Sequence, residues 1–287
     1  MRTKSNGTIG GDLSGNRGHC HNGRFYPKFK KMKNNMKNIG FWFVICMLFG
    51  PFLVNAQSSE GHIRYLVTHN WAKKMAAVDY ISKQQKDKIA YMNAGRSEWK
   101  VFTEMYFTPT KTAYFDSDER AELDDEGYSW RKDAFFVTRD FANNRERDFM
   151  KVLGKDIIVD DTIAKPHWKI LNDLKEVAGH LCMNASWYDS LKQQHIIAWF
   201  AMDMPMPGGP ERLTGLPGLI LEANVNDGAM LISADKIDFR PVLEQELALP
   251  KTGKAKTVSE ADYTAKLAAF IAEKRKAEQP AFWGIRY

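Results

Sequence analysis

Three methionines at alternating positions offer the most specific chemistry in this sequence. Met202, Met204 and Met206 continue a β-rich run that begins at His195. On a strand, every second side chain faces the same way, so the three thioethers would line one face. Soft thioethers bind Cu(I), but methionine also fills gaps in apolar cores. The spacing leaves both interpretations open, and of the two we favour the core-facing strand.

Cysteine and carboxylate side chains give weaker indications. The chain has three cysteines, and only Cys182 lies beyond residue 56. No cationic neighbour in the sequence would activate its thiol, so we expect a buried, small apolar group. Asp160 and Asp161 would face opposite ways on a strand and make a poor acid/base pair. The acidic stretch 116–126 lacks the ligand spacing of a calcium loop and predicts a solvated loop.

Familiar catalytic motifs are absent from the sequence. It contains no Gly-x-Ser-x-Gly elbow, no His-Glu-x-x-His helix and no dinucleotide fingerprint. The five histidines after residue 56 show no ligand spacing; they are His62, His69, His167, His180 and His195. We therefore assign no catalytic residue and no cofactor, and we expect a binding protein rather than an enzyme.

Strand-like segments dominate the chain from residue 57 onward. About nine β-rich runs stand out by composition and alternation. They cover residues 63–68, 99–108, 134–138, 157–159, 168–171, 181–188, 195–203, 219–225 and 229–239. Asn226-Asp227-Gly228 predicts a hairpin, because Asp-Gly tolerates the positive φ of a type I′ turn, and residues 189–193 predict another. Such short connections imply antiparallel neighbours.

Two helices are predicted beside these strands. Asn70 can cap a helix over residues 70–87, and Ser259 can cap a second helix over 259–277, which Pro280 ends. Residues 250–257 form a polar linker, and we expect the apolar tail 282–287 to dock on the body.

The strands and helices together predict a mainly antiparallel β fold of the α+β class, with a curved sheet or half-barrel. A helix near its mouth would enclose an apolar cavity.

The first 56 residues differ from the rest in charge. The net charge of the chain is +6, but residues 1–56 hold nine of the 41 Lys and Arg and one of the 35 Asp and Glu. The remainder therefore carries a net charge of −2. We therefore expect no nucleic-acid partner, because phosphate binding needs clustered positive charge.

The segment 36–56 has the layout of a secretory signal peptide. Lys33 and Lys37 precede an apolar run, Ile39–Val54, of 16 residues. A membrane anchor, the alternative, needs about 20 residues, so we expect cleavage after Ala56. We expect residues 1–35 to be a leader without structure, or to precede the true start. The β domain then spans 57–249, and 250–287 hold the linker, the helix and the docked tail.

Six short motifs follow one another between residues 61 and 221. They are Gly61–Tyr65, Ile157–Asp161 followed by Trp168–Ile170, Gly179–Ala185 around Cys182, Ala198-Trp199-Phe200, Gly209-Pro210, and Gly215-Leu216-Pro217-Gly218-Leu219-Ile220. In these motifs the chain resembles the GLPGLI family, envelope proteins of Gram-negative bacteria. The resemblance implies an exported protein of the periplasm or outer envelope, and it brings no known reaction.

The hexapeptide 215–220 predicts a structural role. Leu216-Pro217-Gly218-Leu219 fits a type II turn in which Gly218 takes a positive φ. A loop that approaches a ligand is the alternative, because glycine permits close backbone contact. A phosphate-binding loop would need a helix after the glycines, and a strand is predicted here instead.

From the sequence as a whole we expect an exported, non-catalytic protein that binds an apolar small molecule or an outer-membrane protein. It would not be an integral membrane protein after signal cleavage. A copper-handling protein and an unrecognised hydrolase are the alternatives.

Overall fold

The computed structural model describes residues 59–92, 98–121 and 134–287. The chain divides into two units between Asn55 and Ala56, and every described residue belongs to the second unit, Ala56–Tyr287. The expected leader and signal peptide lie outside the described residues. Among the residues that are described, no helix is both long and apolar enough to cross a membrane.

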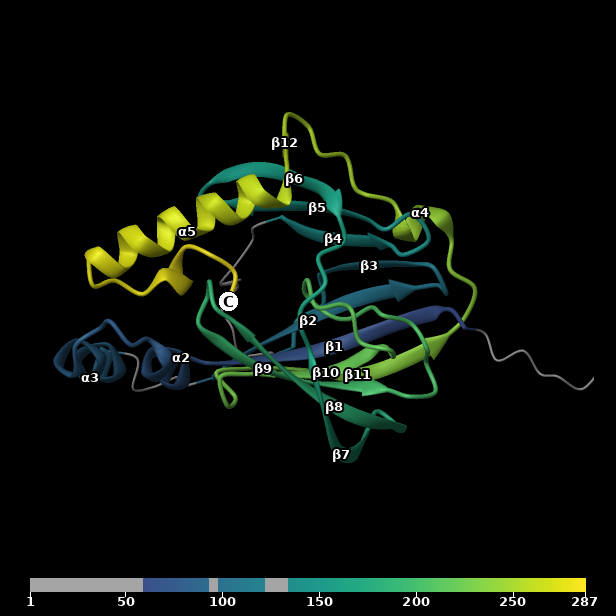
Figure 1. Cartoon of the computed structure of the whole chain (residues 1–287), viewed down its shortest axis with the longest axis horizontal. Coiled ribbons are helices and arrows are strands. Elements are labelled where there is room, and N and C mark those ends of the chain that lie inside the picture. Colours follow the sequence, from purple (N-terminus) through teal and green to yellow (C-terminus); the bar gives the residue numbers. More distant parts are fainter. Residues whose placement is uncertain (1–58, 93–97, 122–133) are drawn as a thin grey trace, which may run out of the picture. The chain divides into compact units, whose positions relative to one another are not determined.

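Twelve strands form one open sheet (Figure 1), in the order β12-β6-β5-β4-β3-β2-β1-β11-β10-β9-β8-β7. Neighbours are antiparallel except for β12 and β6, which run parallel. The strands are β1 Gly61–Asn70, β2 Glu98–Phe107, β3 Lys111–Asp116, β4 Phe135–Asp140, β5 Arg145–Val152, β6 Lys155–Thr162, β7 Lys169–Val177, β8 His180–Asp189, β9 Gln194–Ala201, β10 Ile220–Val225, β11 Met230–Phe239 and β12 Lys256–Val258. The prediction of a mainly antiparallel β fold is confirmed.

Three of these strands, β3, β5 and β12, are not predicted by the sequence. The first four residues of β5, Arg145–Asp148, are all charged although Glu146 and Asp148 are buried, so this half of the strand shows no apolar alternation. β12 has three residues and lies at the end of the segment predicted to be a linker. β9 is shorter than predicted, because the chain turns after Ala201.

The C-terminal helix is confirmed as α5, Glu260–Lys276, and Ser259 caps it by accepting a hydrogen bond from the backbone N–H of Asp262. A single helix over residues 70–87 is wrong. Two helices occur there, α2 Trp71–Ala77 and α3 Lys83–Met92. The first ends at Val78, whose backbone is extended, and Ile81 in the connection packs with Met75 and Phe282. A short helix, α4, covers Glu244–Leu247, and a 3-10 turn, η2, covers Ala281–Trp283.

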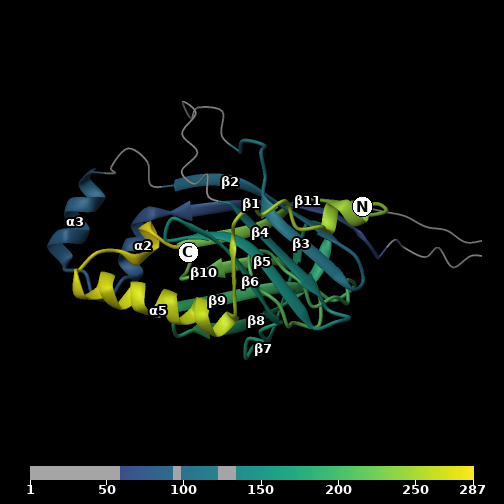
Figure 2. The same cartoon turned by 90° about the horizontal axis from the view of Figure 1, so that it is seen from above.

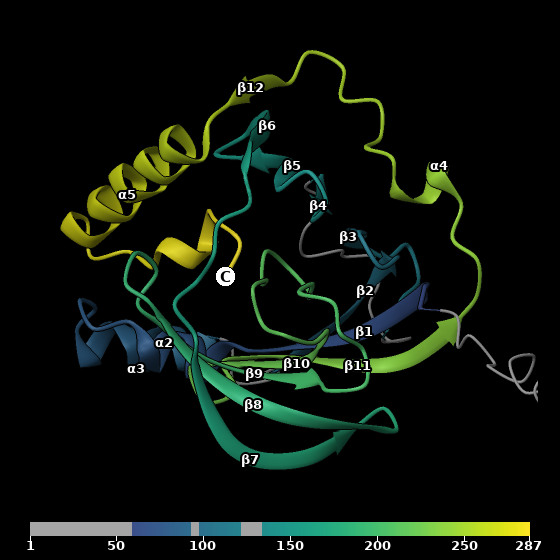
Figure 3. The ribbon, with the colours of Figure 1, turned by 45° about the vertical axis from the view of Figure 1, so that its right-hand side comes forward.

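The sheet curls so that β4, β5 and β6 lie across an interior from β8, β9 and β10 (Figure 3). The main core fills the concave side and joins β1, β2 and β11 through Tyr65, Phe107 and Ile232. Helix α5 packs on β5 and β6, with Tyr263 and Leu267 against apolar residues of those strands. Helices α2, α3 and α5 lie at the same end of this unit (Figures 1 and 2).

Both predicted hairpins are present. β10 and β11 pair across residues Asn226, Asp227 and Gly228, whose φ values are 48°, 51° and 84°. Asparagine, aspartate and glycine tolerate this left-handed region better than other residues, which explains why the turn can be recognised from the sequence. β8 and β9 form the second hairpin.

The hexapeptide 215–220 does not form the predicted type II turn. The residue with a positive φ is Gly215, at 92°, whereas Gly218 lies outside the left-handed region. Gly218 is needed for close approach: a Cβ there would lie 2.0 Å from the carbonyl oxygen of Ala201. Beside it, the N–H of Ala201 donates to the carbonyl of Leu219 at 2.9 Å. The motif thereby fastens the long loop 202–219 to the end of β9.

Replacing Gly218 with alanine should therefore destabilise the protein by about 3 kcal/mol or more, since a backbone oxygen cannot yield as a side chain can. Gly154→Ala is the matched control. Its φ is +77° with nothing within 4 Å of the added Cβ, so only backbone strain of about 1–2 kcal/mol is expected. Urea unfolding followed by circular dichroism measures both. Equal losses in the two variants would contradict the close-approach role.

Candidate functional site

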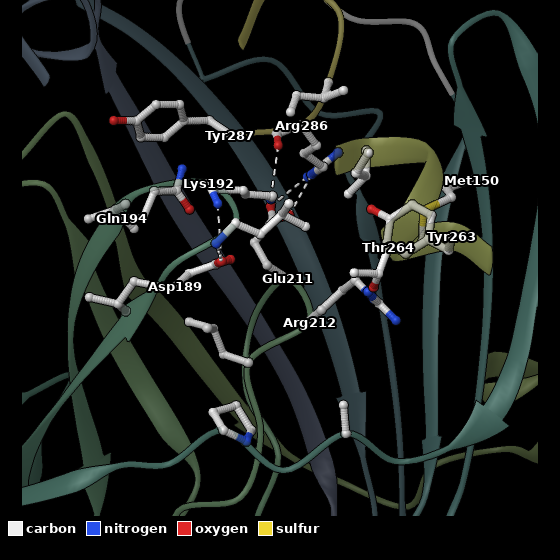
Figure 4. Close-up of a pocket in the computed structure, with 18 of the residues that line it drawn as sticks. Met150, Asp189, Lys192, Gln194, Glu211, Arg212, Tyr263, Thr264, Arg286 and Tyr287 are labelled. Carbon is white, nitrogen blue, oxygen red and sulfur yellow. Dashed lines mark hydrogen bonds and ion pairs between the residues drawn. The ribbon is translucent and has the colours of Figure 1, made fainter. Parts of the chain in front are cut away.

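A cavity of about 420 Å³ lies between the concave sheet, α5 and the C-terminal residues (Figure 4). Its volume falls in the range of pockets that hold small molecules. Apolar side chains from the sheet and α5 line much of it, among them Met150, Ile196, Val225, Ile232 and Leu267. Charged side chains from several separate parts of the chain also line it, so the cavity can accommodate both an apolar body and a polar group.

Arg212 organises the charges on one side of the cavity. Its Nε donates to Asp148 at 2.7 Å, and its Nη2 donates to Glu146 at 3.0 Å and to Glu260 at 2.6 Å. Arg139, on β4, also pairs with both carboxylates of β5. One guanidinium on the loop 202–219 therefore ties β5 to the first turn of α5.

Burial and neighbouring charges together shift the pKa values of the groups on this side of the cavity. Loss of water raises the pKa of the Glu146 carboxyl, although Arg139 and Arg212 oppose that change. Burial would lower the pKa of Arg212, but Asp148 and Glu260 hold it well above its usual value. Burial also raises the pKa of the Tyr263 hydroxyl to about 12. At neutral pH, this side therefore presents fixed positive guanidinium groups, and the protonated form of Glu146 is favoured more than for an ordinary carboxyl.

Arg286 organises a second group of charges. Its guanidinium donates to Glu211 from Nε at 2.5 Å and from Nη2 at 2.7 Å, and to Asp116 at 2.9 and 2.6 Å. Tyr114 Oη donates to Glu211 Oε1 at 3.2 Å. The backbone of Glu211 has a φ of 56°, which is uncommon for a residue other than glycine. Asp116, predicted to lie in a solvated loop, is instead the last residue of β3 and part of this group.

Lys192 completes the polar lining. Figure 4 shows its side chain beside Arg286, where Nζ donates to the Arg286 carbonyl at 3.0 Å. Its backbone N–H donates to Asp189 Oδ1 at 3.1 Å, which fixes the turn between β8 and β9. Burial lowers the pKa of the Lys192 ammonium. An acceptor on a ligand would therefore reduce the cost of keeping this group charged.

The three methionines do not share a strand face, because β9 ends before them. Met204 and Met206 are 7% and 5% exposed and belong to the main apolar core, whereas Met202 is 44% exposed. The alternation that suggested copper binding is therefore missing. Cys182 is fully buried, and loss of water raises its pKa to about 11, which suits a packed thiol. In the described part of the chain, His, Cys, Asp and Glu form no group of three that could hold a metal ion.

The family-motif residues meet around the loop 202–219. The indole of Trp168 donates to the Thr214 carbonyl at 2.8 Å, directly before Gly215. A Cβ on Gly209 would lie 2.8 Å from the Cβ of Ile220, so these two motifs are in contact. Leu216, Leu219 and Ile220 are buried. Pro217 lies between them, and Trp199, on β9, lies under Lys175, whose Nζ is 4.3 Å from its ring centre. The contacts of Trp168, Gly209 and Gly218 therefore hold the loop in place.

The sequence does not identify the charged residues of the cavity. Glu211 and Arg212 directly follow Gly209-Pro210, so the motif marks their position but not their partners. Glu146 and Asp148 share the face of β5 that also buries Met150. Two acids on the apolar face of a strand are a signal of a buried ion pair, and that signal is available only after β5 is recognised.

Comparison with protein families finds one matching model, described as "Protein of unknown function (Porph_ging)", over residues 186–222. This stretch includes Trp199, Gly209-Pro210 and the hexapeptide 215–220. A search of the curated proteins found no match. Two solved structures of PNGF-II are similar, with 14% and 15% identity and TM-scores of 0.46 and 0.48. They cover 73% and 72% of this chain, and the chain spans about a third of theirs, 33% in each.

Arg212→Ala should cost about 3–5 kcal/mol of stability at neutral pH, because Glu146 and Asp148 then keep only Arg139 as a cationic partner. The stability difference from wild type should narrow at low pH, where protonation of these carboxylates removes their excess negative charge. Arg145→Ala, which breaks the exposed pair with Asp160, should leave the urea midpoint close to that of wild type. Urea unfolding at several pH values measures all three proteins. A pH-independent loss for Arg212→Ala would contradict the electrostatic explanation.

Proposed function

We propose that this protein is a non-catalytic binding protein that holds a small amphipathic molecule in the cavity between the sheet and α5. The observation that carries the proposal is the lining of this cavity: an apolar floor from β5, β9, β10 and β11 beside a set of ordered guanidinium and carboxylate groups. Burial of apolar ligand surface would supply affinity, and the charged groups would select the ligand. The proposed ligand is apolar, as expected from the sequence, but it also carries a polar group at one end.

The charged groups support binding more than catalysis. Glu146, Asp148 and Glu260 are all engaged by Arg212, and Glu211 is engaged by Arg286. A general base must be within reach of a substrate proton, and a carboxylate already held by a guanidinium is a weak one. A hydrolase would need one of these pairs to open, and the raised pKa of Glu146 is the feature that would then serve it, as a proton donor.

A substitution at the cavity mouth tests the binding function. Thr264 and Ala265 are both exposed on α5, but only Thr264, labelled in Figure 4, lines the cavity. Thr264→Trp should weaken binding of the neutral apolar dye N-phenyl-1-naphthylamine by about tenfold, by filling space that the dye needs. Ala265→Trp should leave binding unchanged. Fluorescence titration measures both, and the proposal fails if wild type does not bind the dye or if both variants bind it equally.

We also propose that the protein is exported to the periplasm or outer cell envelope, as the residues before Gln57 and the GLPGLI resemblance suggest. The support is the basic start, the 16-residue apolar run and the small residue at its end. Mass spectrometry of the protein from an envelope fraction should find an N-terminus at Gln57. A mature protein that retains residues 36–56 would contradict the cleaved signal and favour the anchor.

A further inference from the structure

The C-terminal residues form a wall that three cavities share. Arg286 and Tyr287 line the main cavity and also two smaller ones, of about 60 and 90 Å³. One of these lies beside α2 and the other beside β2. Displacement of Arg286 and Tyr287 would therefore remove a wall that these three cavities have in common.

The segment is held by side chains, not by strand pairing. Within the described ranges, no strand of the sheet pairs with residues 277–287. Tyr287 Oη accepts a hydrogen bond from Asn226 at 2.8 Å, and Trp283 stacks on Trp71 with ring centres 5.2 Å apart. Trp283 is still 47% exposed. Phe282 and Ile285 of the same segment are buried in apolar clusters. Release of these side-chain contacts would leave the hydrogen-bond ladder of the sheet intact.

The strongest of these contacts is the one made by Arg286. Both Asp116 and Glu211 receive two hydrogen bonds from its planar guanidinium. Lysine cannot reproduce this geometry, because its compact ammonium group has three donors and cannot make two hydrogen bonds to each of two carboxylates. With Arg286 removed, two acids would face the groove without a cation, so the site selects a guanidinium group.

The position of Tyr287 indicates what should accompany that guanidinium. Its ring packs against Phe282 and the main core, and the Lys74 ammonium lies 4.3 Å from its centre. An aromatic group next to an arginine would fill the same place. The segment Gly284–Tyr287 therefore has the side chains that a ligand of this groove would need.

We propose that Asp116 and Glu211 form a recognition site for the arginine of a peptide with a neighbouring aromatic residue, and that the C-terminal segment fills this site until such a peptide displaces it. The inference rests on the proposed binding function and names the class of its ligand. Apolar contacts in the cavity hold the aromatic group, and the two carboxylates hold the arginine.

The test uses the full-length chain with Arg286→Ala, which leaves Asp116 and Glu211 without their guanidinium partner. The probe is the capped tetrapeptide Gly-Ile-Arg-Tyr, the sequence of residues 284–287. Isothermal titration calorimetry should show that the variant binds it at least tenfold more tightly than wild type, whose own segment competes. The same peptide with citrulline in place of arginine, which lacks the charge, should bind at least tenfold more weakly. Arg275→Ala, which affects an exposed pair with Asp79, should bind the peptide as wild type does.

The outcomes separate this inference from the binding function. Equal binding of the arginine and citrulline peptides, or no binding by Arg286→Ala, overturns the guanidinium site. The dye titration decides the cavity independently, so dye binding without peptide binding leaves the proposed function intact. If Arg286→Ala does not fold, Arg286→Lys keeps a positive charge. It should still bind the arginine peptide more tightly than wild type does, and equal binding there overturns the inference as well.

Discussion

A guanidinium that is largely removed from water needs acceptors around it, and Arg212 meets this requirement beside the cavity. Its partners, Glu146, Asp148 and Glu260, come from β5 and from the start of α5. Neither acid of β5 could be buried alone, because an unpaired charge out of water is strongly unfavourable. The loop 202–219, the strand β5 and the helix α5 therefore have to assemble together, and the cavity is the space that their assembly leaves.

The loop that carries Arg212 is itself held by close backbone packing. Gly218 lets the chain pass against the Ala201 carbonyl, and Gly209 lets it pass against Ile220. The indole of Trp168 adds a hydrogen bond to the Thr214 carbonyl from the far side of the loop. These contacts explain why residues that carry no charge decide where the charges of the cavity lie.

The cavity combines two kinds of selectivity. Its floor is apolar and rewards any ligand that removes hydrocarbon surface from water. Its ordered ion pairs favour only a ligand whose charged group takes the place of the group that it displaces. Opening a buried ion pair without such a replacement is strongly unfavourable. Arg286 is the partner best placed for such an exchange. It belongs to a segment outside the sheet, whereas Arg139 and Arg212 are held by strand and loop contacts.

The sequence by itself determined the features that depend on near neighbours. The hairpin at Asn226-Asp227-Gly228 and the cap of α5 at Ser259 were predictable, because a turn or a cap is decided by residues within a few positions. The mainly antiparallel class followed from short turns between β-rich runs. Tertiary structure decided that the methionines leave the strand, that Gly218 serves close approach, and which charges meet. Asp148 and Arg212, like Asp116 and Arg286, lie far apart in the chain, so only the curl of the sheet brings them together.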